Sequence, residues 1–136
     1  MTKQFTLGKK ERLKSRKLIG ELFSVGDNFP FSPFRIYYLF CPLLSNSSVL
    51  QFGISVPSKN FKRAVDRNRI KRLTREAYRL QKKELQETLK EKKLQLNIFL
   101  VYTAKEFSDF NTVKEKLKLI LNRMLKITNE NHSSNS

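Results

Sequence analysis

The sequence of 136 residues contains one cysteine, one histidine and no tryptophan. The single cysteine, Cys41, excludes a framework of internal disulfide bonds and suits a reducing compartment. The single histidine, His132, lies in a polar stretch at the C-terminus. This composition argues against a Ser-His-Asp triad, a His-Cys zinc site and a nuclease that uses two histidines.

Long hydrophobic runs are also missing. The longest, residues 36–44, is interrupted by Pro42 and is too short to cross a bilayer. The N-terminal residues lack the apolar core of a signal peptide. We therefore expect a cytoplasmic protein with no membrane partner. Because 39% of the residues are hydrophobic, including eleven phenylalanines, the chain can form a core. We expect one domain over residues 1–128 and a disordered polar tail over residues 129–136.

Acidic residues are few, and the basic ones are concentrated in two segments. The chain has 28 Lys and Arg against 12 Asp and Glu, a net charge of +16. Residues 1–17 carry seven basic groups and one acid, and residues 59–83 carry eleven basic groups and two acids. Like charges gathered in this way repel one another, and a polyanion relieves that repulsion. The expected partner is therefore an acidic polymer.

The periodicity of apolar residues predicts alternating helices and strands. Helical spacing appears in residues 11–25, 66–92 and 112–127. Strand patterns appear in residues 34–40, 50–56 and 97–103, with room for a further short strand near 29–33. The strands over 34–40 and 50–56 are expected to form a hairpin-like pair. Strand 97–103 is apolar on both faces, as in a strand buried within a sheet. The fold class is α+β, a mixed sheet with helices packed on it.

The predicted helix over residues 66–92 has two different faces. Ile70, Leu73, Ala77 and Leu80 form an apolar stripe. On the other side, polar residues project within about 60° of one another. They are Asn68, Arg72, Arg75 and Arg79. The arginine fork can hold phosphate oxygens in pairs, and a helix N-terminus also attracts anions. Asn68 is suited either to a base edge or 2′-OH or to a local backbone group.

This region resembles a known family. The chain reads Gly-Ile-Ser-Val at 53–56, Lys-Asn at 59–60 and Arg-Asn-Arg-Ile-Lys-Arg-Leu-Thr-Arg-Glu at 67–76. That combination is similar to the signature of the bacterial ribonuclease P protein component, and the similarity extends from about Arg12 to the last helix. The resemblance implies a two-layer α/β sandwich of the ribosomal S5 domain 2-like type with the order αβββαβα.

The resemblance also implies a function. The protein would be the accessory subunit of an endonuclease, a hydrolase that removes the 5′ leader of precursor tRNA. It would bind a catalytic RNA that holds most of the Mg²⁺, and the protein itself would supply no catalytic residue and no metal ligand. The expected RNA-binding residues are Lys59, Lys62, Arg63, Arg67, Asn68, Arg69, Lys71, Arg72, Arg75 and Arg79.

A second expected site is a cleft between the first helix and the sheet that holds the single-stranded leader. By resemblance its residues are Ile19, Phe23, Tyr37, Gln51 and Ser55. Aromatic groups there would stack on bases without sequence preference. Ile19 departs from the family, which often has Phe at that position. The alternative is that Phe23 and Tyr37 are ordinary core residues.

Two other functions compete with this one. A ribosomal or other structural RNA-binding protein would explain the charge and fold class but not the specific string over 67–76. A DNA-binding protein is disfavoured, because the polar face of helix 66–92 is mostly Arg and Lys, which suit phosphates rather than base reading. We therefore expect precursor tRNA and the catalytic RNA as partners, and no DNA.

Overall fold

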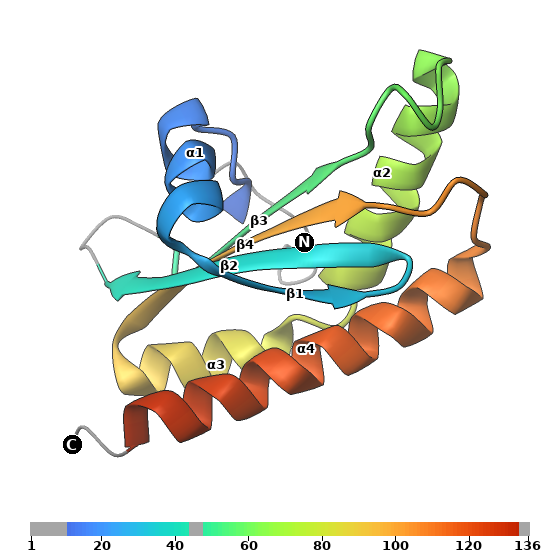
Figure 1. The fold of residues 1–136 in the computed structure, drawn as a ribbon. Coiled ribbons are helices and arrows are strands. Elements are labelled where there is room, and N and C mark those ends of the chain that lie inside the picture. The colour runs from blue at the N-terminus through green and yellow to red at the C-terminus, as the bar shows by residue number, and fades with distance from the viewer. Residues whose placement is uncertain (1–10, 44–47, 134–136) are drawn as a thin grey trace, which may run out of the picture.

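The computed structural model describes residues 11–43 and 48–133, which fold into a four-stranded sheet and helices (Figure 1). In chain order the elements are α1 (Arg16–Val25), β1 (Asp27–Phe31), β2 (Phe34–Pro42), β3 (Leu50–Ser55), α2 (Ala64–Arg79), α3 (Lys83–Lys92), β4 (Leu94–Tyr102) and α4 (Phe110–Ser133). The predicted α+β class is confirmed, and β1 is the expected additional short strand. None of the helices within these ranges is long and apolar enough to span a bilayer.

The strand order β1-β2-β4-β3 corrects the expected hairpin-like pair. β4 lies between β2 and β3, antiparallel to the first and parallel to the second. The reason lies in β4 itself, because almost all of its residues are buried. A strand that is apolar on both faces is most stable in the interior of a sheet, where both of its edges are also paired. β3 is thereby displaced from β2.

The two faces of the sheet are covered unequally. One face packs on α2, α3 and α4 and holds the main core, which includes Ile36, Phe52 and Leu100. α1 lies across the opposite face (Figure 1) and forms a smaller cluster around Leu22 and Phe99. Side chains alternate along a strand, so neighbouring residues of β2 supply both clusters. A single ten-residue helix covers only part of its face.

The helix expected over residues 66–92 is two helices, separated at Leu80–Lys82. Two members of the predicted stripe, Ile70 and Ala77, are buried, whereas Leu80 is 40% exposed. Thr74 and Tyr78 complete the buried face instead. Thr74 tolerates burial because its hydroxyl donates to the carbonyl of Ile70 at 2.9 Å. The Tyr78 ring stacks on Phe52, with centroids 3.9 Å apart.

The ends of the other helices also differ from the prediction. α1 begins at Arg16 rather than residue 11, because the Ser15 hydroxyl caps it by accepting from the Leu18 amide at 3.3 Å. Residues before the cap lie along the edge of β3, where the Leu13 amide donates to the Phe52 carbonyl at 2.9 Å. At the other end α4 continues to Ser133, so residues 129–133, expected as tail, are helical. Residues 134–136 lie outside the described residues.

A buried ion pair joins the N-terminal segment to the break between α2 and α3. The Lys82 side chain is 2% exposed, and its ammonium group is paired with the Glu11 carboxylate. The Gln86 amide donates to the same carboxylate at 3.1 Å. Burial and the negative charge of Glu11 raise the pKa of the neighbouring Tyr78 phenol. Lys82 thus belongs to the interior, although it lies in the most basic stretch of the sequence.

We predict that Lys82→Ala destabilises the protein strongly, because removing one partner leaves the Glu11 carboxylate partly buried without its charge partner. The expected loss in the free energy of unfolding is about 3 kcal/mol. Lys83→Ala, at the exposed neighbouring position, is the control and should change it by less than about 0.5 kcal/mol. Urea unfolding of the three proteins measures both. Equal midpoints for wild type and Lys82→Ala would contradict the assignment.

Candidate RNA-binding surfaces

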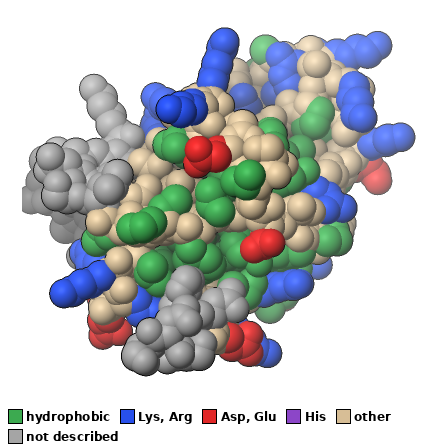
Figure 2. All heavy atoms as spheres, turned by 60° about the vertical axis from the view of Figure 1, so that its left-hand side comes forward, with side chains coloured by type: hydrophobic (Ala, Val, Ile, Leu, Met, Phe, Trp, Pro, Cys, Tyr) green, Lys and Arg blue, Asp and Glu red, His purple; other side chains and the backbone are tan. Residues whose placement is uncertain are grey.

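The N-terminal half of α2 projects from the fold and carries basic side chains around its exposed side. α2 contacts β3 and α4 through its buried face, which leaves the opposite side open. Asn68, Arg69 and Arg72 are exposed there. The loop before the helix adds the exposed Lys59, Lys62 and Arg63. We call these six residues the α2 ridge. Figure 2 shows a face of the molecule with hydrophobic groups in the middle and Lys and Arg mostly toward its margins.

Three of the predicted RNA-binding residues lie at the sides of α2 or in its last turn. Lys71 is half-buried, and Arg75 faces the α1 side of the molecule, where it lines a cleft. Arg79 is half-buried and ion-paired with Glu76, with 2.5 Å between nitrogen and oxygen. That hydrogen bond raises the pKa of Arg79. The structure therefore places the predicted residues around the helix, and not all of them on one face.

Arg67 has a local role that the sequence did not reveal. Its guanidinium donates to the carbonyls of Phe61 and Lys62 at 2.8 and 2.9 Å. These two carbonyls belong to the loop that leads into α2. Arg67 thus fixes the path of that loop, and only part of its guanidinium group is directed at solvent.

A cleft of about 260 Å³ lies between the N-terminal segment, α1 and the sheet. Its lining residues are Arg12, Leu13, Lys14, Ile19, Phe52, Gly53, Ile54, Arg75 and Phe99. Its floor is strand backbone and apolar side chains, and its basic groups come from the N-terminal segment and α2. Ile19, the residue that departs from the family, lines this cleft directly.

Glycine at position 53 is required by the close packing around this wall of the cleft. A Cβ atom there would lie 2.6 Å from the Phe99 ring and 3.0 Å from the Leu13 carbonyl oxygen. The first distance is shorter than Cβ contacts in folded proteins, and the second is tighter than nearly all of them. Glycine therefore lets the Phe99 ring and the N-terminal segment lie directly against β3.

The predicted aromatic pair lies beside this cleft. The Phe23 and Tyr37 rings are in edge contact with centroids 4.6 Å apart, and Phe99 lies 5.6 Å from Phe23. Phe23 is nevertheless 48% exposed. The alternative, that Phe23 is ordinary core, does not fit this exposure. Tyr37 is half-buried beneath it and packs with the α1 cluster.

Positive charge is brought together at the cleft. Burial and the charge of Arg12 lower the pKa of Arg75, although an arginine stays protonated at neutral pH. Two guanidinium groups from distant parts of the chain thus repel each other across a narrow space. An anion bound between them would relieve this repulsion.

Gln51 and Ser55 lie on β3 with Gly53, on the side of the sheet that α1 covers in part. Both are half-buried, and they are paired in register with Asn97 and Val101 of β4. Neither lines the cleft itself. The predicted leader residues therefore share one face of the sheet, with Ile19 in the cleft and the others around it.

Sequence reasoning missed several lining residues. Arg12 and Lys14 belong to the basic segment 1–17, but the charge of that segment does not show that these side chains line a cleft. Phe99 lies in a strand that is apolar on both faces, so its pattern does not show which side chains face α1. Within the part of the chain that the structure describes, no three His, Cys, Asp or Glu side chains gather as a possible metal site.

The chain is similar to known proteins of one family. The family model described as Ribonuclease P matches residues 7–125. The chain is 39% identical over 122 residues to the ribonuclease P protein component of Porphyromonas gingivalis strain W83, which covers 88% of this chain and 87% of the relative. It is 29% identical over 128 residues to that of Chlorobium phaeobacteroides, with 88% of each chain covered.

A solved structure shares the fold. The ribonuclease P protein of Thermotoga maritima superposes with a TM-score of 0.61 at 28% identity, covering 83% of this chain and 96% of the other. The match thus includes almost the whole of the solved protein. The family model, the relatives and the shared fold agree, and the chain belongs to the ribonuclease P protein family.

Proposed function

We propose that this subunit of ribonuclease P binds the catalytic RNA of the enzyme through the α2 ridge and holds the 5′ leader of precursor tRNA in the cleft beside α1. The family supports the association with both RNAs. The division of labour between the two surfaces is our inference from the geometry. The hydrolysis itself is assigned to the RNA subunit, so the whole assembly is a hydrolase and the chain is its accessory part.

The observation that carries the proposal is the composition of the cleft. It combines an apolar wall that includes Ile19 and Phe99, the guanidinium groups of Arg12 and Arg75, and an adjoining half-exposed aromatic ring, Phe23. Single-stranded RNA has matching parts, since its phosphates suit the guanidinium groups and its bases suit the ring. The cleft thus places apolar side chains and positive charge side by side, next to an aromatic ring.

The α2 ridge suits a different ligand. It is convex, exposed and rich in arginine, which favours contact with the phosphates of a folded RNA. A ribosomal or other structural RNA-binding protein would need such a ridge but has no use for the cleft. DNA is disfavoured as a ligand because Asn68 is the only uncharged polar side chain of the ridge.

Mg²⁺ is proposed to reside mainly on the RNA. Carboxylate oxygens are the protein ligands that Mg²⁺ prefers, and the described residues bring no three acidic, His or Cys side chains together. We therefore assign no step of the reaction to a metal held by this chain. The proposed location is the cytoplasm, where precursor tRNA is made.

We predict that Phe23→Ala weakens binding of precursor tRNA to the holoenzyme by about 1–3 kcal/mol, the range for loss of one base-stacking contact. Binding of mature tRNA, which lacks the leader, should hardly change. Tyr37→Ala should act in the same direction. Equilibrium binding to both tRNAs measures the difference. Val25→Ala, at a 66% exposed position at the end of the same helix, is the control. Equal losses for both tRNAs would indicate misfolding or failed assembly and would give Phe23 and Tyr37 a structural role instead.

A second prediction separates two neighbouring arginines. Arg72→Ala should weaken binding of the RNA subunit by about 1–3 kcal/mol and leave thermal stability unchanged, because Arg72 is exposed. Arg67→Ala should also lower the melting temperature, because two backbone carbonyls lose their donor. RNA titrations and thermal melts measure the two effects. Identical melting temperatures for the two variants would refute the local role of Arg67.

A third prediction concerns the location of the chemistry. The purified protein should not cleave precursor tRNA at any Mg²⁺ concentration, and adding the RNA subunit should restore cleavage at the 5′ end of the mature sequence. Gel analysis of labelled precursor tests this. Accurate cleavage by the protein alone, sensitive to protease and insensitive to nuclease pretreatment, would overturn the assignment of catalysis to RNA.

A further inference from the structure

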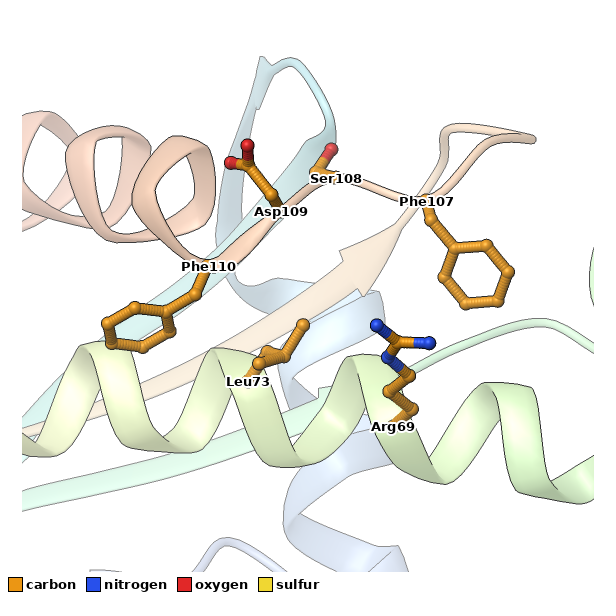
Figure 3. Close-up of a pocket in the computed structure, with 6 residues that line it drawn as sticks. All are labelled: Arg69, Leu73, Phe107, Ser108, Asp109 and Phe110. Carbon is orange, nitrogen blue, oxygen red and sulfur yellow. The ribbon is translucent and has the colours of Figure 1, made fainter.

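A second pocket lies on the other side of α2 from the cleft. Its volume is about 410 Å³, and it opens between α2 and the segment that joins β4 to α4 (Figure 3). Arg69 and Leu73 project into it from α2, and Phe107, Ser108, Asp109 and Phe110 line the facing wall. Arg69 and Arg75 are six residues apart, a rotation of about 120° around a helix. The α2 ridge therefore separates this pocket from the cleft.

An exposed aromatic ring forms one wall of the pocket. Phe107 is 48% exposed, and Figure 3 shows its ring beside the guanidinium of Arg69, whose carbon lies 5.7 Å from the ring centroid. The Phe61 ring contacts Phe107 with centroids 5.1 Å apart. Phe107 is thus held in position from one side and open to solvent on another. A preoriented ring beside a guanidinium is a stacking platform for a flat, electron-rich group.

The remaining lining adds an apolar floor and polar acceptors. Leu73 and Phe110, both half-buried, give the floor. The Asp109 carboxylate accepts from the Thr112 amide at 2.8 Å, and this bond lowers the pKa of Asp109, which keeps it ionised. An ionised carboxylate can accept further hydrogen bonds from N–H groups. The pocket thus offers a platform and an apolar floor, whereas the Asp109 carboxylate is directed away from Leu73 and Arg69 (Figure 3).

We propose that this pocket receives a single unpaired base of the RNA subunit when that RNA docks on the α2 ridge. The base stacks on the Phe107 ring beside the guanidinium of Arg69 and contacts the apolar floor. The occupant follows from charge and position, because the pocket opens beside the basic ridge and shares Arg69 with it. An RNA strand that follows the ridge therefore passes its mouth. The inference rests on the proposed function and extends it from phosphate contacts to a base contact.

The test compares three variants of Phe107 in binding of the RNA subunit. Phe107→Leu keeps an apolar side chain against Phe61 but removes the ring, and should weaken binding about tenfold. Phe107→Tyr keeps the ring and should bind like wild type. Phe107→Ala should weaken binding at least as much as Phe107→Leu. Leu119→Ala is the control, because Leu119 is exposed to the same degree, 47%, on α4. Thermal melts show whether each variant remains folded.

Salt dependence distinguishes a base contact from a phosphate contact. A stacking contact neutralises no phosphate, so its loss does not change the number of counterions that binding releases. Phe107→Leu should therefore lower affinity without changing the slope of log K against log salt. Arg72→Ala should reduce the size of that slope by about one. Chemical probing of the RNA subunit should show one unpaired nucleotide that wild type and Phe107→Tyr protect and Phe107→Leu does not.

Other results would overturn the inference. Wild-type affinity for the RNA subunit in folded Phe107→Leu would show that no base occupies the pocket. A loss confined to precursor tRNA would place the occupant in the substrate instead of the RNA subunit. Failure of the proposed function would look different. In that case the wild-type protein itself would neither bind the RNA subunit nor support cleavage.

Discussion

The central position of β4 is the constraint on which the rest of the structure depends. This strand is buried on both faces and paired along both edges, so it must have a core above and below. Three helices supply the core on one face, and α1 with the N-terminal segment supplies a smaller one on the other. Because this second cover is small, part of the sheet stays accessible. The cleft is the space that remains between the cover and the strand.

Two further features keep that space in shape. Gly53 allows Phe99 and Leu13 to approach the strand closely, and the buried pair of Lys82 and Glu11 secures the N-terminal segment. Breaking a buried ion pair is costly because the remaining charge loses its partner. The segment that carries Arg12 is thus held against the sheet by an interior contact. The basic wall of the cleft depends in this way on a lysine that never reaches the surface.

The sequence predicted the fold class, the basic helix and the order of elements apart from the break between α2 and α3, because these depend on local periodicity and charge. It did not predict the strand order, since the pairing of β3 with β4 is a choice between distant segments. Nor did it reveal the burial of Lys82, whose partner is 71 residues away in the chain. In the sequence Arg67 does not differ from the basic residues around it. Only the structure shows that its guanidinium donates to the carbonyls of Phe61 and Lys62. The family resemblance, and not the periodicity, placed Ile19 at the cleft.

The position of α2 between the two pockets has a consequence for the spacing of ligands bound in them. The cleft lies on one flank of this helix and the pocket at Phe107 on the other, and a helix with its side chains is about 10 Å across. If one flank holds the leader and the other holds the RNA subunit, the helix fixes the separation between them. The distance between the leader and the catalytic RNA is then set by the width of α2 and does not depend on the sequence of the leader.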